Sequence, residues 1–410
     1  MNTDKLPEEY LAHMKASLSG DFEAFLRSYE LPAEKALRFN PRKVREETRE
    51  KLIESWKLEP VPWCGDGYYY NEDTVRPGLS PYHDAGVFYI QEPSAMITAA
   101  SAGIQRTDWV LDLCAAPGGK STQAAAACGL LVSNEPVPAR ARILSSNVER
   151  LGFTNTVVTS AWPEELSEVF SEAFDRIIVD APCSGEGMMR KDETAVSEWS
   201  PANVEQCITR QTGILEAAAS MLKPGGSLTY STCTFEYGEN EGQILSFLER
   251  HPEFSLKEKH MLYPHEIRGE GHFCAVLIRE GVSVPSPEPD PLKTGAYLKK
   301  RRIHVLRAGL EKGETKQDRK GKEYYTPSHA EAMAKIWETD EGRKINIKDE
   351  ALCLRYLKGE SLDLSGAGDL VEVIGEDGWM TVYFDRYSIG LGKRVGNTLK
   401  NHYPKGLRHL

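Results

Sequence analysis

Two cysteines occupy positions that suit a reactive thiol. Cys183 lies in the segment Asp-Ala-Pro-Cys-Ser-Gly, directly after the apolar run 176–179, and Cys233 lies in Ser-Thr-Cys-Thr, directly after the run 227–230. A thiolate is a strong nucleophile and can divide one difficult reaction into two easier steps. Ligands of parallel sheets bind beyond the carboxyl ends of the strands. If the two strands are neighbours, both thiols face one cleft; two buried structural cysteines are the simpler alternative.

A glycine-rich turn adds a candidate ligand-binding backbone. Residues 111–120, Leu-Asp-Leu-Cys-Ala-Ala-Pro-Gly-Gly-Lys, lead from a strand-like run into the start of a helix. Glycines allow close approach of a ligand, and a helix start presents free N–H groups. The spacing matches neither G-x-G-x-x-G nor the Walker pattern, which disfavours a dinucleotide or nucleoside triphosphate site. Glu135, one strand later, can accept hydrogen bonds from ribose hydroxyls, although a lone acid there is more commonly solvated.

The elements around these motifs alternate between strand and helix. Such alternation predicts a mostly parallel sheet with helices on both faces, an α/β fold. The expected strands are 109–113, 130–134, 156–159, 176–179, 227–230 and 272–278, and the expected helices are 121–127, 138–151, 161–173, 203–222 and 239–250.

Composition limits the remaining possibilities. The chain has 410 residues, and none of its apolar runs approaches the roughly 20 residues that a membrane-spanning helix needs. Its eight cysteines contain no C-x-x-C pair, so we expect no zinc or other metal site. The amino-terminal residues carry acids and no apolar signal core, so we expect a cytoplasmic protein without membrane contact.

Positive charge gathers toward the carboxyl end although the net charge is −11. No acid follows Asp385, yet six bases do: Arg386, Lys393, Arg394, Lys400, Lys405 and Arg408. Between Pro291 and Leu310 there are six further bases and no acid: Lys293, Lys299, Lys300, Arg301, Arg302 and Arg307. Stretches of one sign are candidate phosphate-contact surfaces, with a solvated basic face as the alternative.

Four segments are expected along the chain. Residues 1–100 combine helical and strand-like stretches, and 101–281 hold the alternating pattern. Residues 282–292 are rich in proline and are typical of a linker. Residues 293–410 are expected to form a small α+β module.

Three motifs together resemble the Nol/Nop/Sun family of RNA 5-methylcytosine methyltransferases. They are Cys-Ala-Ala-Pro-Gly-Gly-Lys, Asp-Ala-Pro-Cys-Ser-Gly-x-Gly and Ser-Thr-Cys-Thr, in this order. The segments 38–40 and 91–94 are similar to upstream elements of that family. The tail from Gly392 to Arg408 is similar to the RsmF/YebU-like bacterial branch, which acts on small-subunit ribosomal RNA. The resemblance implies a Rossmann-like class I methyltransferase domain, an N-terminal α+β extension that binds RNA, and a PUA-like C-terminal α+β module that also binds RNA.

The resemblance also implies roles for individual residues. The methyl donor S-adenosylmethionine would be bound by Cys114, Ala115, Ala116, Pro117, Gly118, Gly119, Lys120, Glu135 and Asp180. Cys233 would be the nucleophile and Cys183 would act in product release, with Asp180 also polarising the base. The family has a further acid after the third strand, near the adenine; here that segment is Ser-Ala-Trp-Pro-Glu, residues 160–164. The acid is missing, and Trp162 either stacks on adenine or packs internally.

The chemistry explains why a thiol is needed. Carbon 5 of cytosine is a poor nucleophile until a thiolate adds to carbon 6 and makes the ring enamine-like. Chemistry alone does not decide which cysteine attacks, because in the related DNA enzymes the attacking cysteine follows a proline, as Cys183 does.

The partner is therefore expected to be RNA, most directly 16S ribosomal RNA, with transfer RNA as the alternative substrate. A non-catalytic RNA-binding ribosome assembly factor and a nucleotide-dependent oxidoreductase are the other possibilities. The intact Cys183, Cys233 and Asp180 disfavour the assembly factor, and the glycine spacing disfavours the oxidoreductase.

Overall fold

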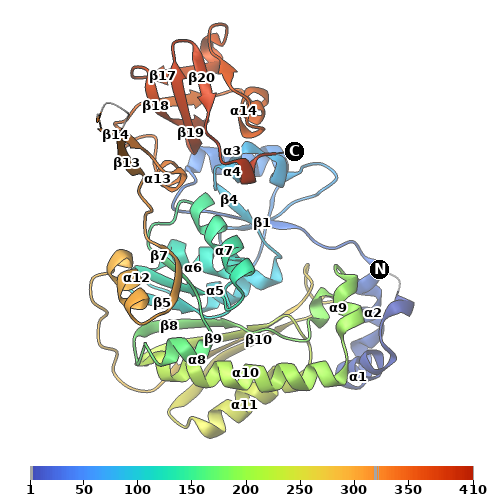
Figure 1. The fold of residues 1–410 in the computed structure, drawn as a ribbon. Helices are drawn as coiled ribbons and strands as arrows, with labels where there is room; N and C mark the ends of the chain where they lie inside the picture. Colours follow the sequence, from blue (N-terminus) through green and yellow to red (C-terminus); the bar gives the residue numbers. More distant parts are fainter. Residues whose placement is uncertain (1–2, 318–320, 322, 410) are drawn as a thin grey trace.

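A computed structural model describes residues 3–317, 321 and 323–409 (Figure 1). Its central layer is an eight-stranded sheet in the order β10-β11-β9-β8-β5-β6-β7-β12. The five middle strands are parallel: β5 (Trp109–Asp112), β6 (Leu130–Asn134), β7 (Thr156–Ser160), β8 (Phe174–Asp180) and β9 (Leu222–Thr232). The outer strands are antiparallel to their neighbours: β10 (Phe254–Leu262), β11 (His272–Arg279) and β12 (His304–Ala308).

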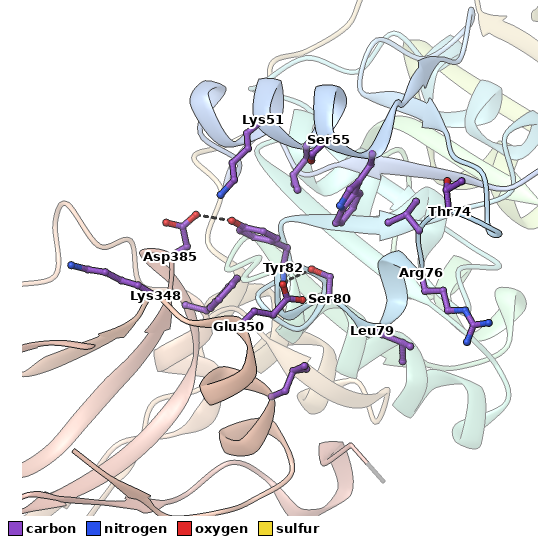
Figure 2. Close-up of a pocket in the computed structure, with 15 residues that line it drawn as sticks. Lys51, Ser55, Thr74, Arg76, Leu79, Ser80, Tyr82, Lys348, Glu350 and Asp385 are labelled. Atoms are coloured by element: carbon purple, nitrogen blue, oxygen red, sulfur yellow. Dashed lines mark hydrogen bonds between the residues drawn. The ribbon is translucent and has the colours of Figure 1, made fainter. Parts of the chain in front are cut away.

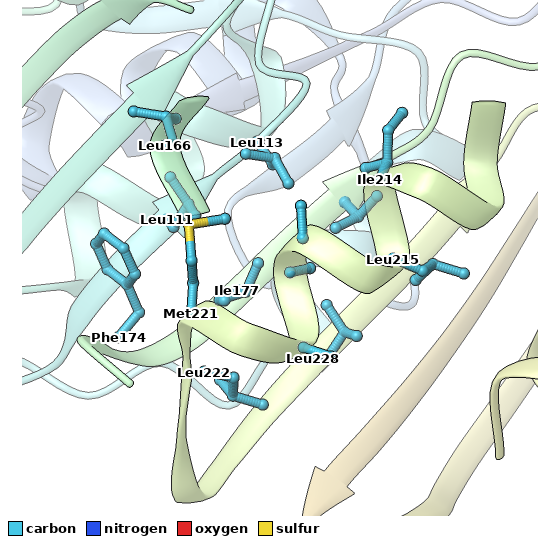
Figure 3. Packing of buried hydrophobic residues seen from close by; sticks show 14 of the residues in the cluster. Leu111, Leu113, Leu166, Phe174, Ile177, Ile214, Leu215, Met221, Leu222 and Leu228 are labelled. Carbon is cyan, nitrogen blue, oxygen red and sulfur yellow. The ribbon is translucent and has the colours of Figure 1, made fainter. Parts of the chain in front are cut away.

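Helices cover both faces of this sheet because consecutive strand residues point to opposite sides. Val110, Leu131 and Ile178 pack with α6 (Gly119–Ala127) and α7 (Pro138–Arg150). Their chain neighbours Leu111, Val132 and Ile177 pack on the opposite side, which α10 (Pro201–Met221) and α11 (Glu241–Arg250) cover. Figure 3 shows this second core, with Ile214, Leu215 and Met221 over Leu111, Ile177 and Leu228. The expected α/β class is confirmed.

The structure differs from the expected elements in several places. The helix predicted over 161–173 is only α8 (Pro163–Ser167), because Pro163 starts it and the chain then turns into β8. Strand β10 was not predicted, since most of its side chains are exposed or half-buried and its sequence lacks an apolar run. It is an edge strand, which needs only one apolar face.

The predicted C-terminal segment contributes to the central sheet. Residues 281–290 have no regular structure, and α12 (Pro291–Lys300) and β12 follow them. Strand β12 pairs with β7, while Leu298 of α12 packs in the core on the α10 side. Residues 293–308 therefore belong to the central sheet layer, and the smaller module begins after them.

The N-terminal extension and the C-terminal module are each built on a sheet. In the extension, β2 (Glu59–Pro60), β3 (Gly67–Tyr69), β1 (Ala36–Phe39) and β4 (Phe88–Ile90) pair in that order, beside α1 (Glu8–Leu18), α2 (Phe22–Glu30), α3 (Glu46–Trp56), α4 (Pro81–Asp84) and α5 (Ile97–Ser101). In the module, β16 (Leu362–Asp363), β20 (Thr398–Asn401), β19 (Tyr387–Val395), β18 (Gly378–Phe384), β15 (Lys344–Ile347) and β17 (Val371–Ile374) pair in that order, beside α13 (His329–Met333) and α14 (Glu350–Leu357). A hairpin of β13 (Glu314–Gln317) and β14 (Glu323–Thr326) precedes α13.

These two parts share one hydrophobic core. Leu37, Phe39 and Phe88 of the extension belong to the same buried cluster as Ile345 and Tyr356 of the module. Figure 1 shows the module seated on α3 and α4. Removing the module would expose this core to water, so a truncated chain is not a clean probe of RNA binding. In the part of the chain that the structure describes, the helices are too short or too polar to cross a lipid bilayer.

Candidate active site

The site is built where β8 and β9 end side by side. Asp180 closes β8 and pairs in register with Ser231 of β9, so the residues that follow each strand emerge at the same edge. The Sγ atoms of Cys183 and Cys233 lie 3.4 Å apart. The two thiols that the sequence placed after separate strands therefore face one cleft. The hydrogen bond between the two thiols, together with burial, raises the pKa of Cys183 well above its usual value.

Asp180 is held as a carboxylate by a buried cation. Lys120 Nζ donates to its Oδ2 at 2.8 Å, and Ser231 Oγ donates to its Oδ1 at 2.8 Å. Burial alone would raise the pKa of Asp180; Lys120 is the largest of the effects that together outweigh burial and hold that pKa below its ordinary value. His272, whose Nε2 lies 3.7 Å from Asp180 Oδ1, is neutral because burial lowers its pKa to about 3. The Lys120 side chain, whose role the sequence left open, is thus the partner of Asp180.

A buried acid and amides fix the loop that carries Cys183. The carboxylate of Glu239 accepts the Ser184 N–H at 3.0 Å and a Gln211 Nε2 hydrogen bond at 2.7 Å. The same Gln211 nitrogen donates to the Pro182 carbonyl at 3.0 Å. This set holds the backbone on either side of Cys183.

A second set fixes the loop that carries Cys233. The Cys233 carbonyl accepts the Gly187 N–H at 2.8 Å, and Glu186 Oε2 accepts the Phe235 N–H at 2.9 Å. Thr232 Oγ1 and Asn240 Oδ1 are 2.5 Å apart. Phe235 in turn packs edge-on against Phe25 of α2 at 5.5 Å between ring centroids, so the N-terminal helices support this loop. Sequence patterns did not reveal Gln211, Glu239 or Asn240, because their partners are distant in the chain.

The glycine-rich turn joins β5 to α6 as expected. Gly118 has φ +115°, a backbone conformation that L side chains rarely adopt. Arg38, a fully buried side chain, donates from Nη2 to the Gly119 carbonyl at 3.0 Å and from Nε to Gln91 Oε1 at 3.0 Å. Arg38 and Gln91, from the upstream segments 38–40 and 91–94, therefore support the turn.

A cavity of about 630 Å³ connects these parts and is lined by Cys114, Ala116, Glu135, Asp180, Cys183 and Cys233 together with residues of α7, α8 and α10. Small-molecule sites commonly measure about 300–1,000 Å³. Glu135, which is only 2% exposed, lines this cavity. Its Oε1 accepts the Val137 N–H at 3.0 Å, and its Oε2 lies 3.3 Å from Arg140 Nη1. The cavity runs from an acid suited to ribose hydroxyls to the paired thiols, so its residues fit S-adenosylmethionine with the reacting methyl near the cysteines.

The remaining predicted donor residues lie beside this cavity. Ala115, Pro117, Gly119 and Lys120 line a smaller hollow of about 190 Å³, which shares Cys114, Ala116 and Asp180 with the larger one. Gly118 lines neither of these two hollows, so its contribution is the shape of the turn. Trp162, Pro163 and Glu164, which follow β7, also line the larger cavity.

A third hollow lies between the extension and the C-terminal module. Figure 2 shows this cavity of about 560 Å³, with Lys51 and Arg76 from the extension and Lys348 from the module at its rim. Tyr82 Oη donates to Asp385 Oδ2 at 2.6 Å across it. Among the residues that the structure describes, none forms an ion pair with Lys51, Arg76 or Lys348.

The basic stretches do not all face solvent. Arg307 is 2% exposed, and its Nη1 lies 2.8 Å from Glu149 Oε2, so it cannot serve as a phosphate contact. Arg394 lies 3.7 Å from Asp377. Most of the other predicted bases remain exposed.

Comparison with known families matches most of the chain. The family 16S rRNA methyltransferase RsmB/F matches residues 101–278, the N-terminal domain of 16S rRNA methyltransferase RsmF matches 6–93, and the methyltransferase RsmF PUA domain matches 344–409. Ribosomal RNA small subunit methyltransferase F of Enterobacter sp. (strain 638) is 30% identical across 99% of this chain and 96% of its own length. The protein of the same name from Vibrio cholerae serotype O1 is 32% identical across 98% of this chain and 97% of its own length.

Solved structures share the fold. A methyltransferase homolog protein from Pyrococcus horikoshii has a TM-score of 0.58 at 23% identity, and covers 68% of this chain and 100% of its own. The structure titled NSun6 from Pyrococcus horikoshii with SFG has a TM-score of 0.59 at 21% identity, and covers 67% of this chain and 99% of its own. At this identity the likeness carries the fold alone.

Proposed function

Because the chain belongs to the ribosomal RNA small subunit methyltransferase F family, we propose that it methylates carbon 5 of a cytosine in RNA of the small ribosomal subunit. The chain uses S-adenosylmethionine, as a member of this methyltransferase family. The observation that carries the carbon 5 assignment is the pair of thiols 3.4 Å apart at the edge of the donor cavity. Methyl transfer to an amino group or a ribose hydroxyl needs no thiol, whereas carbon 5 does.

In the proposed reaction Cys233 attacks first. Its sulfur forms a bond to carbon 6 of the cytosine, and the electron density this places on carbon 5 accepts the methyl group. When bound, S-adenosylmethionine supplies an electrophilic methyl on a sulfonium. Carbon 5 takes the methyl group with S-adenosylhomocysteine as the leaving group. Carbon 5 then gives up its proton to water, the electron pair restores the carbon 5–carbon 6 double bond, and the carbon 6–sulfur bond breaks to release Cys233 as a thiolate. Cys183, whose Sγ lies 3.4 Å from the Sγ of Cys233, stands beside the bond that must break.

Asp180 and Lys120 prepare the base for attack. The Asp180 carboxylate can accept from the cytosine amino group, and Lys120 Nζ, at 2.8 Å from Asp180, places a positive charge next to the same edge. Charges held in place before the reaction stabilise the transition state without reorganisation. The target base must leave its stack to reach this cleft, which unpaired RNA allows at low cost.

Transfer of labelled methyl from S-adenosylmethionine, measured on small-subunit ribosomal RNA and transfer RNA side by side, tests the proposal. We expect incorporation into the ribosomal RNA. Labelling of transfer RNA alone would point to the related tRNA enzymes, and no labelling of either would favour a non-catalytic assembly factor.

We further propose that the RNA backbone crosses the hollow between the extension and the module. Lys51 and Lys348, cations without an ion pair among the described residues, line this hollow from its two sides (Figure 2). Reversing both charges, Lys51→Glu with Lys348→Glu, should weaken RNA binding at least tenfold. The slope of log affinity against log salt should fall by roughly 1 to 2, because two phosphate contacts are lost. Filter binding across a salt series measures both quantities.

A control double variant separates the effect of this hollow from the effect of overall net charge. Lys15→Glu with Arg27→Glu makes the same change in net charge on the exposed faces of α1 and α2, away from the hollow. We expect that pair to change RNA affinity less than threefold. Equal losses from the two double variants would show that only overall charge matters.

A further inference from the structure

One wall of the donor cavity lies outside the three sequence motifs described above. Trp162 lines this cavity, yet its side chain is 62% exposed. Tryptophan is usually well buried and its indole N–H usually bonded when it packs internally. Across the described ranges 3–317 and 323–409, neither a hydrogen bond of the Trp162 indole nor a ring contact is present. The indole therefore presents a flat and largely exposed apolar surface at the cavity.

The backbone that carries Trp162 is firmly placed. Its N–H donates to Glu165 Oε2 at 2.7 Å, and buried Pro163 begins α8 directly after it. This point lies two residues beyond the end of β7, and β7 is the neighbour of β6, which leads into Glu135. The Glu135 N–H is bonded to the Thr159 carbonyl at 3.1 Å, so the acid and the indole sit on adjacent strand ends.

Glu164 adds a free acceptor to the same wall. It also lines the cavity, and its Oε1 lies 3.7 Å from the point that a Cβ would occupy on Gly213 of α10. The carboxylate thus extends from α8 toward α10. It has no ion pair or side-chain hydrogen bond within the part of the chain described, although Arg210 lines the cavity too. A carboxylate without a hydrogen-bond partner at a ligand cavity suits a ligand that carries an N–H or O–H group.

We propose that Trp162 and Glu164 together bind the adenine of the methyl donor, in place of the acid that the family carries after its third strand. The indole stacks on one face of the base, and the Glu164 carboxylate accepts a hydrogen bond from its exocyclic amino group. In this orientation the ribose hydroxyls of the methyl donor lie at Glu135, one strand away, and its sulfonium lies toward the thiols. This assignment rests on the proposed donor site and names the residues that select adenine within it.

Binding of two product analogues tests the assignment by calorimetry, without turnover. S-adenosylhomocysteine carries the amino group, whereas S-inosylhomocysteine carries a carbonyl oxygen there and a proton on the adjacent ring nitrogen. The unaltered full-length protein should prefer S-adenosylhomocysteine at least tenfold. A site that accepts a hydrogen bond from the amino group of the ligand rejects a ligand that lacks this group. Trp162→Ala should weaken the binding of both ligands equally, by about tenfold, because stacking does not depend on which substituent the ring carries.

Glu164 should act on selectivity instead. Glu164→Ala should reduce the preference for the adenine form to below threefold, and Glu164→Gln should retain affinity for that form while accepting the inosine form, because an amide can both accept and donate. Tyr237→Ala removes a similarly exposed aromatic side chain, 56% exposed, that does not line the cavity, and should change neither affinity.

Three results would overturn the inference. Unchanged affinity in Trp162→Ala, or an unchanged preference in Glu164→Ala while the unaltered protein binds S-adenosylhomocysteine, would remove adenine from this wall and leave the donor site standing. Absence of binding by the unaltered protein would remove the donor site itself, and this inference with it.

Discussion

Cys233→Ala is expected to abolish methyl transfer, with a loss of more than about a thousandfold in turnover, because no other group can attack carbon 6 from the same position. Donor binding should persist, since the side chain removed does not shape the glycine-rich turn or Glu135. Labelled methyl transfer to RNA measures the first quantity, and calorimetric titration with S-adenosylhomocysteine measures the second. On a denaturing gel this variant should show no covalent RNA–protein band.

Cys207→Ala is the matched control for this variant. Cys207 is a buried free thiol on α10, and it does not line the donor cavity. Its replacement should leave turnover within about threefold of the unaltered protein. Substantial activity in Cys233→Ala would contradict a covalent route through that residue.

Cys183→Ala is expected to trap the reaction at its end. Cys233 can still attack and the methyl group can still arrive, but the adduct should resolve slowly without the thiol that lies 3.4 Å from the attacking sulfur. A band of RNA joined to protein should accumulate, survive denaturation and depend on added S-adenosylmethionine. The double variant Cys183→Ala with Cys233→Ala should lose that band.

The opposite pattern would reverse the assignment. If Cys233→Ala accumulates the adduct and Cys183→Ala does not, the attacking residue is the cysteine that follows the proline, as in the DNA enzymes. If turnover and adduct levels of Cys183→Ala match those of the unaltered protein, Cys183 has only a packing role in its buried loop.

Much of the central domain could be predicted from local sequence. The parallel strands are apolar runs because they are covered on both faces, and each was found within a few residues of its observed bounds, apart from β9, which begins five residues earlier. Strand β10 was not predicted because one side of it is open to water. Strand β12 was not predicted because it pairs with β7 from beyond the proline-rich segment. Antiparallel edge pairing of that kind leaves no local pattern.

The reactive residues of the site could also be predicted from local sequence, but the residues that hold them in place could not. Cys183, Cys233 and Asp180 stand in contiguous motifs at strand ends, where spacing reveals them. Glu239 binds the Cys183 loop from 55 residues away, and Arg38 reaches the glycine-rich turn across 81. Such partners depend on the final packing, as does the core that the N-terminal extension shares with the C-terminal module. The same packing removed Arg307 from the basic surface by pairing it with Glu149.

The central claim, methylation at carbon 5 through a covalent adduct, is tested most directly by following the proton that must leave. Small-subunit ribosomal RNA is prepared with tritium on carbon 5 of its cytosines and incubated with the protein and carbon-14-labelled S-adenosylmethionine. Carbon 5 can keep only one of the two substituents, so we predict one tritium released to water for each labelled methyl group incorporated. Methyl incorporation with the tritium retained in the RNA would contradict the account, because the methyl group would then lie on another atom.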